Sequence, residues 1–163
     1  MRLATILTAL TLATASAASA QDLGIALGTA APAAAVRTLD GKPANLDQWI
    51  GKTPVVLTFW ATWCPSCKEL EPALAAAARQ YAGRAQFVAV AVSANQSAER
   101  VRRHLARSPL PMPVVYDADG AATGAYDVPA TSYVVVLDRA GKVVYTGLGG
   151  DQDIVAALRK AGL

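Results

Sequence analysis

The sequence predicts an α/β domain in which helices cover both faces of a central mixed β-sheet. Two runs of apolar and β-branched residues, 55–60 and 87–92, have the composition of strands that are buried on both faces. Each run is followed by a segment with helical spacing, and a β-hairpin and a last helix complete the chain. Strands and helices that alternate in this order form layered α/β sheets, and 163 residues suffice for one such domain with its own core.

A long helix is predicted after the first buried strand. Residues 67–82 are rich in Ala, Leu and Glu at helical spacing, Pro72 interrupts them, and Gly83 stands where a helix commonly ends. Before the strand, residues 45–50 have the pattern of a short helical turn, which the following Lys52-Thr53-Pro54 ends. Only residues 61–66 separate strand 55–60 from the long helix, so the connection between them is short.

A second helix is predicted after the second buried strand. Residues 97–106 have helical spacing, and Ser97 is a suitable N-cap. Residues 112–116 form a short extended segment. The next run, Asp117-Ala118-Asp119-Gly120, has the first ligands of a calcium loop but not the later ones, so we predict a turn.

The chain is predicted to end in a β-hairpin and a helix. Residues 132–137 and 142–146 flank a turn sequence, Asp138-Arg139-Ala140-Gly141, which is typical of a hairpin. We expect Asp151 to cap the final helix, which runs to Lys160.

The first twenty residues have the order of a secretory signal peptide. Arg2 supplies a positive charge, residues 3–15 are apolar, and residues 16–20 contain an Ala-x-Ala cleavage motif. The apolar run is shorter than the roughly 20 residues that span a bilayer. We therefore predict cleavage near Ala20 and a mature chain, residues 21–163, that does not span the membrane and lies in the periplasm or is secreted.

The charge of the chain does not indicate a nucleic-acid partner. Fifteen Lys and Arg residues against twelve Asp and Glu residues give a formal net charge of +3, and the basic residues are scattered. The densest basic run, Arg100-Val101-Arg102-Arg103, lies in a helical pattern and is interpreted as a solvated face.

The two cysteines are the main functional signal. Cys64 and Cys67 lie three positions apart. A disulfide across such a small loop constrains little of the unfolded chain, which argues against a structural staple. A structural zinc site needs about four ligands, whereas the chain has these two thiols and one distant histidine, His104. A redox-active dithiol remains, and we predict neither a metal nor a cofactor.

The position of the dithiol predicts its chemistry. Cys64 stands at the expected helix start, Cys67 lies one turn inside, and Pro65 suits the first turn. Free N–H groups and the helix dipole favour an anion there, so the pKa of the Cys64 thiol should be below its ordinary value of roughly 8.5. We predict that the Cys64 thiolate attacks a substrate disulfide and that Cys67, the more buried thiol, resolves the mixed disulfide.

The residues around the dithiol resemble a known family. Residues 55–67, which end in Phe59-Trp60-Ala61-Thr62-Trp63-Cys64-Pro65-Ser66-Cys67 and are followed by Pro72, are similar to the thioredoxin superfamily, above all to its exported TlpA/ResA-like branch. Asp40-Gly41-Lys42 is similar to the turn of that branch's N-terminal hairpin. The resemblance implies a thioredoxin-like fold over residues 21–163 and thiol–disulfide exchange with protein thiols or disulfides. It also implies a reductant, for example in cytochrome c or copper-site assembly, which a membrane electron-donor redox protein recharges.

Two positions differ from the family pattern. Thioredoxins bury an acidic residue on the strand before the motif, where this chain has Thr58. The branch usually has Glu three residues after the second cysteine, where this chain has Leu70 between Glu69 and Glu71. This chain therefore lacks the carboxylates that the family has at these two positions.

A third difference concerns the cis-proline that the family places beside the dithiol. The family spacing, counted back from Asp138, reaches Ser132, whereas the nearest proline is Pro129. We favour replacement by Ser132 and keep Pro129 with an insertion as the alternative. A cis bond before serine would cost about 2.5–4 kcal/mol, so a trans peptide is expected. The resemblance implies that the backbone of Thr131 and Ser132 docks a partner's extended chain.

Exposed positions are predicted for two further side chains, those of Trp63 and His104. Trp63 is expected to be an exposed platform for partners, and Pro65 is expected to bind substrate beside it. His104, on a charged helix, is expected to be a surface residue.

Three alternative functions stay open. Copper handling would use the thiolates with a further ligand, for which Met112 and His104 are not obviously placed. A peroxidase would need Thr or Ser three residues before the reactive cysteine, where the chain has Ala61. A binding module with an incidental disulfide is the alternative without enzymatic activity.

Overall fold

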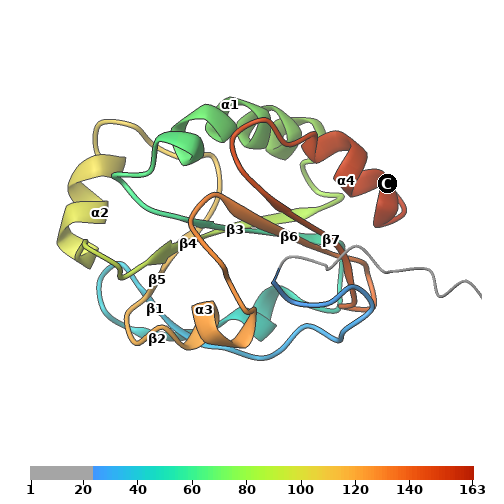
Figure 1. The fold of residues 1–163 in the computed structure, drawn as a ribbon, viewed down its shortest axis with the longest axis horizontal. Coiled ribbons are helices and arrows are strands. Elements are labelled where there is room, and N and C mark those ends of the chain that lie inside the picture. The colour runs from blue at the N-terminus through green and yellow to red at the C-terminus, as the bar shows by residue number, and fades with distance from the viewer. Residues whose placement is uncertain (1–23) are drawn as a thin grey trace, which may run out of the picture.

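A seven-stranded mixed sheet forms the centre of the protein, whose computed structural model describes residues 24–163 (Figure 1). The strand order is β2-β1-β5-β4-β3-β6-β7. In that order the strands are Pro43–Asn45, Ala35–Thr38, Val114–Asp117, Gln86–Val92, Val55–Trp60, Tyr133–Leu137 and Val143–Leu148. Strands β3, β4 and β5 are parallel neighbours, and the other pairs are antiparallel. The prediction of a mixed sheet is confirmed, whereas the predicted signal peptide lies outside the described residues.

Helices cover both faces of the sheet, as predicted. The helices are α1 (Pro65–Gln80), α2 (Ala98–Leu105), α3 (Ala121–Ala125) and α4 (Ile154–Lys160), with a 3₁₀-helix, η1, at Leu46–Trp49. Helices α1 and α4 lie together above the sheet in Figure 1, and α3 lies below it. None of the helices in residues 24–163 has the length and apolar character needed to cross a membrane.

The alternation of side chains along β3 divides the core between the two faces. Leu57 and Phe59 belong to the cluster on the α3 side, while Val56 packs with α1 and α4. Trp60, which has the same orientation as Val56, packs with Val101 of α2. Successive strand residues point to opposite faces, so a strand that is buried on both sides is mostly apolar, and in β3 the buried Thr58 is the single polar residue.

Helix α3 was not predicted from the sequence. It is five residues long, and its N-cap is Gly120. The fully buried Asp117 carboxylate accepts hydrogen bonds from the amides of Ala122 and Thr123 at 3.0 and 2.8 Å. Because this carboxylate at the end of β5 supplies the acceptors that the first turn of the helix needs, α3 depends on a contact across the preceding turn.

Some element ends differ from the predictions. Helix α1 begins at Pro65 with Cys64 as its N-cap, in agreement with the predicted helix start at Cys64, but it ends at Gln80 and not at Ala82. The cap of α4 is Asp153 and not Asp151: the Asp153 side chain accepts from the amide of Ala156 at 2.8 Å. The predicted Ser97 cap of α2 is confirmed by its bond with the amide of Arg100 at 3.2 Å.

The antiparallel pairing of β3 and β6 positions the site. Phe59 lies opposite Tyr133, so the last residue of β3 faces the residue before β6. The amide of Ser132 donates to the carbonyl of Phe59 at 2.9 Å. The loop before β6 and the dithiol loop after β3 therefore leave the sheet at the same edge.

Candidate active site

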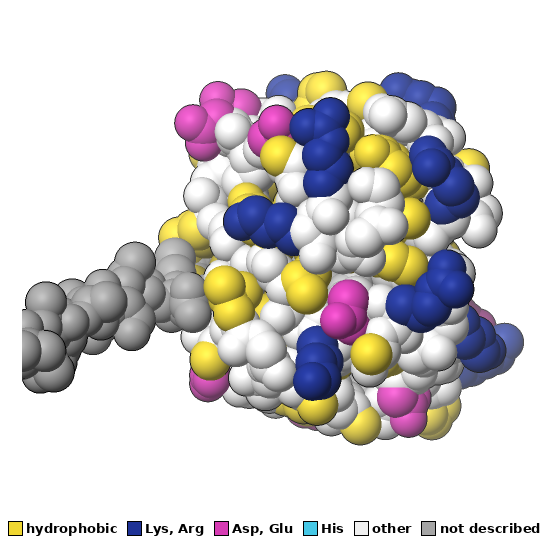
Figure 2. Space-filling model, turned by 90° about the vertical axis from the view of Figure 1, so that its right-hand side faces the viewer, with side chains coloured by type: hydrophobic (Ala, Val, Ile, Leu, Met, Phe, Trp, Pro, Cys, Tyr) yellow, Lys and Arg dark blue, Asp and Glu magenta, His cyan; other side chains and the backbone are white. Residues whose placement is uncertain are grey.

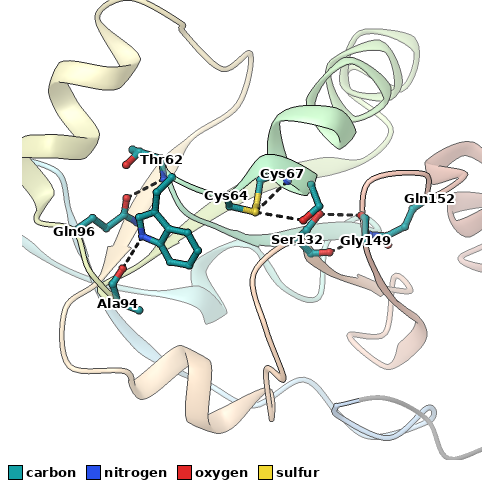
Figure 3. The surroundings of a disulfide bond; sticks show 10 residues. Thr62, Cys64, Cys67, Ala94, Gln96, Ser132, Gly149 and Gln152 are labelled. Carbon is teal, nitrogen blue, oxygen red and sulfur yellow. Dashed lines mark hydrogen bonds between the residues drawn. A yellow bond between two sulfur atoms is a disulfide. The ribbon is translucent and has the colours of Figure 1, made fainter.

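A disulfide joins Cys64 and Cys67 at the start of α1, with an S–S distance of 2.08 Å (Figure 3). The Cys64 sulfur accepts a hydrogen bond from the amide of Cys67 at 3.0 Å and lies 3.5 Å from the Ser66 hydroxyl. Pro65, the first helical residue, has no N–H that would need a partner there. The side chain of Cys64 thus takes the capping position that an oxygen usually occupies.

The burial of the two cysteines is the reverse of the prediction. Cys64 is 5% exposed, whereas Cys67 is half-buried. Cys64 belongs to the core cluster that contains Phe59 and Ala61, because the chain turns into the domain directly after β3. Cys67, on the first turn of α1, lies at the edge of that cluster and beside a cavity. Burial therefore does not decide which sulfur attacks, and Cys64 as nucleophile stays a prediction that depends on its capping position.

The loop before Cys64 is held by a buried glutamine that the sequence analysis did not single out. The Oε1 atom of Gln96 accepts from the amide of Thr62 at 2.9 Å (Figure 3), and its Nε2 atom donates to the carbonyl of Val92 at 2.6 Å. The hydroxyl of Tyr116 donates to the Gln96 carbonyl at 2.9 Å. Burial, and then the charge of Asp117, raises the pKa of Tyr116, so this phenol remains a donor.

Trp63 lies on the surface beside the disulfide, as predicted. Its side chain is 41% exposed, and its Nε1 atom donates to the carbonyl of Ala94 at 2.9 Å. Pro65 is exposed next to it. The indole is therefore held in place by one hydrogen bond while much of its apolar surface stays open to a partner.

Ser132, and not Pro129, lies at the start of β6 where the family has its cis-proline. Ser132 is fully buried, whereas Pro129 is exposed. Residues 24–163 contain no cis peptide bond, so the expectation of a trans bond before Ser132 is confirmed. Ser132 has a φ of 67°, an angle that is uncommon for a residue with a side chain.

Two residues after β7 hold Ser132 in this conformation. The Ser132 hydroxyl donates to the Gly149 carbonyl at 2.8 Å, and the Gly149 amide donates to the Ser132 carbonyl at 3.1 Å. The Nε2 atom of Gln152 donates to the Ser132 carbonyl at 3.0 Å and to that of Gly149 at 2.7 Å. Figure 3 shows Ser132 between the disulfide and this pair. Sequence reasoning missed Gln152 because nothing local relates it to a residue twenty positions earlier.

A cavity of about 440 Å³ opens beside the disulfide on the α1 side of the sheet. Both cysteines line it, together with polar, charged and apolar residues. The lining residues that could act on a substrate are Thr58, Lys68, Glu71, His104 and Met112. Leu70, at the family's glutamate position, is buried in the core instead, so the carboxylate that borders this cavity is that of Glu71.

His104 is not simply a surface residue. Its ring lies 5.7 Å from that of Trp60 and is half-buried. The Nε1 atom of Trp60 is buried without a hydrogen-bond partner among the described residues. The helical spacing of α2 could not predict this contact, because it depends on how α2 sits on β3.

The copper-handling alternative gains little from this geometry. His104 and Met112 line the same cavity as the cysteines. In the described part of the chain, however, no three side chains of the types His, Cys, Asp and Glu come together as a metal site. No second function is therefore proposed.

The fold and the site define a thiol–disulfide oxidoreductase of the thioredoxin-like class: a Cys-x-x-Cys disulfide caps a helix that follows a central strand of a mixed sheet. The chain belongs to the Redoxin family, whose model matches residues 26–161. Within the thioredoxin superfamily it is a TlpA/ResA-like protein, so the predicted family and enzyme class are confirmed.

Relatives of this class are found among both sequences and structures. The chain is 33% identical to the thioredoxin-like protein YneN of Bacillus subtilis, over 77% of this chain and 73% of the relative. It is 32% identical to the thiol-disulfide oxidoreductase ResA of the same organism, over 74% and 66% of the two chains. A Chlorobium tepidum structure assigned as thiol:disulfide interchange protein DsbE has a TM-score of 0.71 and 29% identity, over 82% and 99%. A secreted disulfide oxidoreductase of Mycobacterium tuberculosis has a TM-score of 0.65 and 26% identity, over 79% and 95%.

Proposed function

We propose that residues 1–20 are removed as a signal peptide and that residues 21–163 reduce protein disulfides in the periplasm or as a secreted protein. The order of residues 1–20 supports export, and a similar protein of Mycobacterium tuberculosis is described as secreted. The reducing direction comes from the resemblance to the TlpA/ResA-like branch, as do cytochrome c or copper-site assembly as the setting and a membrane electron-donor redox protein as the source of electrons.

The observation that carries the chemistry is the position of the Cys64 sulfur at the N-terminus of α1. In the disulfide it already accepts the Cys67 amide at 3.0 Å. When the disulfide is reduced, the same amide and the positive end of the helix stabilise a thiolate at Cys64. Lys68, one turn further along α1 and bordering the same cavity, adds a positive charge nearby.

The exchange reaction uses both cysteines. The Cys64 thiolate attacks one sulfur of the client disulfide, that S–S bond breaks, and a mixed disulfide forms while the client's second sulfur leaves as a thiolate. Cys67 then loses its proton and attacks the Cys64 sulfur, which releases the client's first sulfur. The client gains two electrons and two protons, and the protein ends with the Cys64–Cys67 disulfide.

The surface around the dithiol supports docking of an extended client segment. Trp63 and Pro65 form an exposed apolar side. On the other side, the amide and carbonyl of Ser132 are already bonded to Phe59 and Gly149, while the backbone of Thr131 has no partner among residues 24–163. We therefore assign the docking hydrogen bonds to Thr131, with Ser132 as the residue that positions it.

A measurement of the reduction potential tests the proposed direction. The protein is equilibrated with glutathione redox buffers, and the fraction of Cys64–Cys67 disulfide is determined by alkylation and mass spectrometry. A value near that of thioredoxin, about −270 mV, is expected of a reductant, whereas a value near about −120 mV would contradict the proposal. Cys67→Ser, which cannot resolve a mixed disulfide, serves to trap clients from a periplasmic extract for identification.

A further inference from the structure

A basic hollow borders the dithiol loop on the side of α2. Arg100, Arg103 and Arg107 follow one another at helical spacing and, with Thr62 and His104, line a hollow of about 370 Å³. None of the five lining residues is acidic. Two of these arginines, Arg100 and Arg103, belong to the run 100–103 that was interpreted as a solvated helix face, whereas Arg107 lies beyond it.

The positive charge of this basic hollow is barely neutralised within the described chain. Arg103 has one acidic partner, Glu99, at 3.8 Å, and both side chains are about two-thirds exposed, at 67% and 65%. Such an exposed pair is weak. The Nε atom of Arg100 donates to the Thr62 hydroxyl at 3.2 Å, and the side chain of Arg107 has no hydrogen bond or ion pair in residues 24–163. The guanidinium groups are therefore available to an anion.

The basic hollow adjoins the active-site cavity. Thr62 and His104 line both the hollow and the cavity that contains the two cysteines. Thr62 is two residues before Cys64, and its hydroxyl contacts Arg100 directly. An extended chain advances about 3.3–3.6 Å per residue, so a few residues of a client bound at Cys64 reach the arginines.

Basic side chains are distributed differently at the opposite end of the molecule. Helix α2 lies at the left end of the molecule in Figure 1. The face seen from the opposite end, in Figure 2, has separate Lys and Arg side chains with Asp and Glu among them. The basic hollow beside Thr62, which no acidic residue lines, thus differs from the face at the opposite end of the molecule.

We propose that the basic hollow binds an acidic segment of the client polypeptide next to the client's cysteine, and that the enzyme thereby prefers disulfides flanked by Asp or Glu. Guanidinium groups form paired, charge-assisted hydrogen bonds with carboxylates, and a cluster of one sign raises the rate of encounter with oppositely charged partners. The proposal rests on the proposed exchange of disulfides with client proteins and specifies which clients are preferred.

The test compares three peptides with the same intramolecular disulfide and with flanking Glu, Gln or Lys residues. Reduced protein is mixed with each oxidised peptide under single-turnover conditions, at ionic strengths of about 0.01 M and about 1 M. The variant is R103Q/R107Q, and the matched control is R79Q/R159Q, which removes the same charge from exposed positions at the ends of α1 and α4. A small neutral disulfide, 2-hydroxyethyl disulfide, reports on the dithiol of the wild-type protein alone.

For the wild type and for R79Q/R159Q, the rate with the Glu peptide should exceed that with the Gln peptide about tenfold at low salt, and the Lys peptide should be the slowest. High salt should bring the three rates together, and R103Q/R107Q should reduce the tenfold ratio to about two or less at low salt.

Equal rates for the Glu and Gln peptides in a wild type that reacts with the neutral disulfide would overturn this inference alone. No reaction with the neutral disulfide would overturn the proposed function itself. Equal peptide rates together with arginine-dependent binding to anionic phospholipid vesicles would replace the client segment with a membrane surface.

Discussion

The amide of Thr62 donates a hydrogen bond to the side chain of Gln96 at 2.9 Å, which ties the dithiol loop to the loop that follows β4. The two residues are 34 positions apart, and the side chain of Gln96 is buried. The neighbouring Trp63 is bound to the same loop through Ala94. The bond of Thr62 positions the backbone that presents Cys64 to a client, and the bond of Trp63 positions its indole.

Replacement of Gln96 should loosen this loop. In Gln96→Ala the amide of Thr62 and the carbonyl of Val92 lose their partners, so we expect a loss of about 1–3 kcal/mol in the free energy of unfolding. We also expect slower exchange with client disulfides. Urea unfolding and single-turnover kinetics measure the two effects. Gln80→Ala, at an exposed position of α1, is the control; a Gln96→Ala protein as stable and as fast as this control would contradict the role of Gln96.

Alkylation of the reduced protein should modify Cys64 before Cys67. Cys64 is the N-cap of α1, so the pKa of its thiol should lie below roughly 8.5 and its thiolate should be present at neutral pH. The rate of labelling with iodoacetamide should rise with pH and reach half of its limit below that value. Peptide mapping after brief labelling identifies the residue, and Cys64→Ser and Cys67→Ser assign the two rates. Faster labelling of Cys67, which is the more exposed residue of the disulfide, would reverse the assignment.

Introduction of the family's proline at Ser132 should destabilise this protein. Proline requires a φ near −65°, whereas Ser132 has a φ of 67° and donates its amide to Phe59. The loss of that buried bond alone should lower the free energy of unfolding by about 1–3 kcal/mol in Ser132→Pro, as thermal or urea unfolding can measure. The sequence alone predicts the opposite for Ser132→Pro, namely a larger effect on the range of partners than on the stability of the fold.

The variant Ser132→Gly separates the effect of the backbone conformation at residue 132 from the effect of the side chain. Glycine adopts a positive φ without strain, but it removes the hydroxyl bond with Gly149. Its unfolding free energy should stay closer to that of the wild type than the value for Ser132→Pro. Equal stability of the proline variant and the wild type would show that the backbone at residue 132 adapts to the family's conformation.

Removal of the Trp63 side chain should affect client proteins more than small disulfides. The indole is 41% exposed beside Cys64, so Trp63→Ala should change the free energy of unfolding little. An aromatic contact at the centre of an interface is often worth more than 1 kcal/mol, so the rate with a protein disulfide such as insulin should fall about five- to tenfold. The rate with 2-hydroxyethyl disulfide should be nearly unchanged. Leu27→Ala, at another exposed apolar residue, is the control; equal losses with insulin and the small disulfide would point to damaged dithiol chemistry instead.

The sequence by itself determined most of the elements, although not α3, and the reaction class. The apolar run of β3, the Ser97 cap and the Cys64-Pro65-Ser66-Cys67 motif are local patterns, and local patterns fix the type of an element and the chemistry of adjacent side chains. Because these patterns are local, they do not distinguish between two neighbouring residues that could both cap a helix. The cap of α4 was therefore predicted at Asp151, whereas the structure has it at Asp153.

Only the tertiary structure decided which residues surround the dithiol. The pairing of β3 with β6 brings Ser132 beside the disulfide. From the segments that follow β4, Gln96 binds the loop before Cys64 and His104 lines the cavity beside the cysteines. The reversed burial of the two cysteines likewise depends on how the chain enters the core after β3. These contacts follow from strand order and helix packing, which side-chain spacing along one segment does not contain.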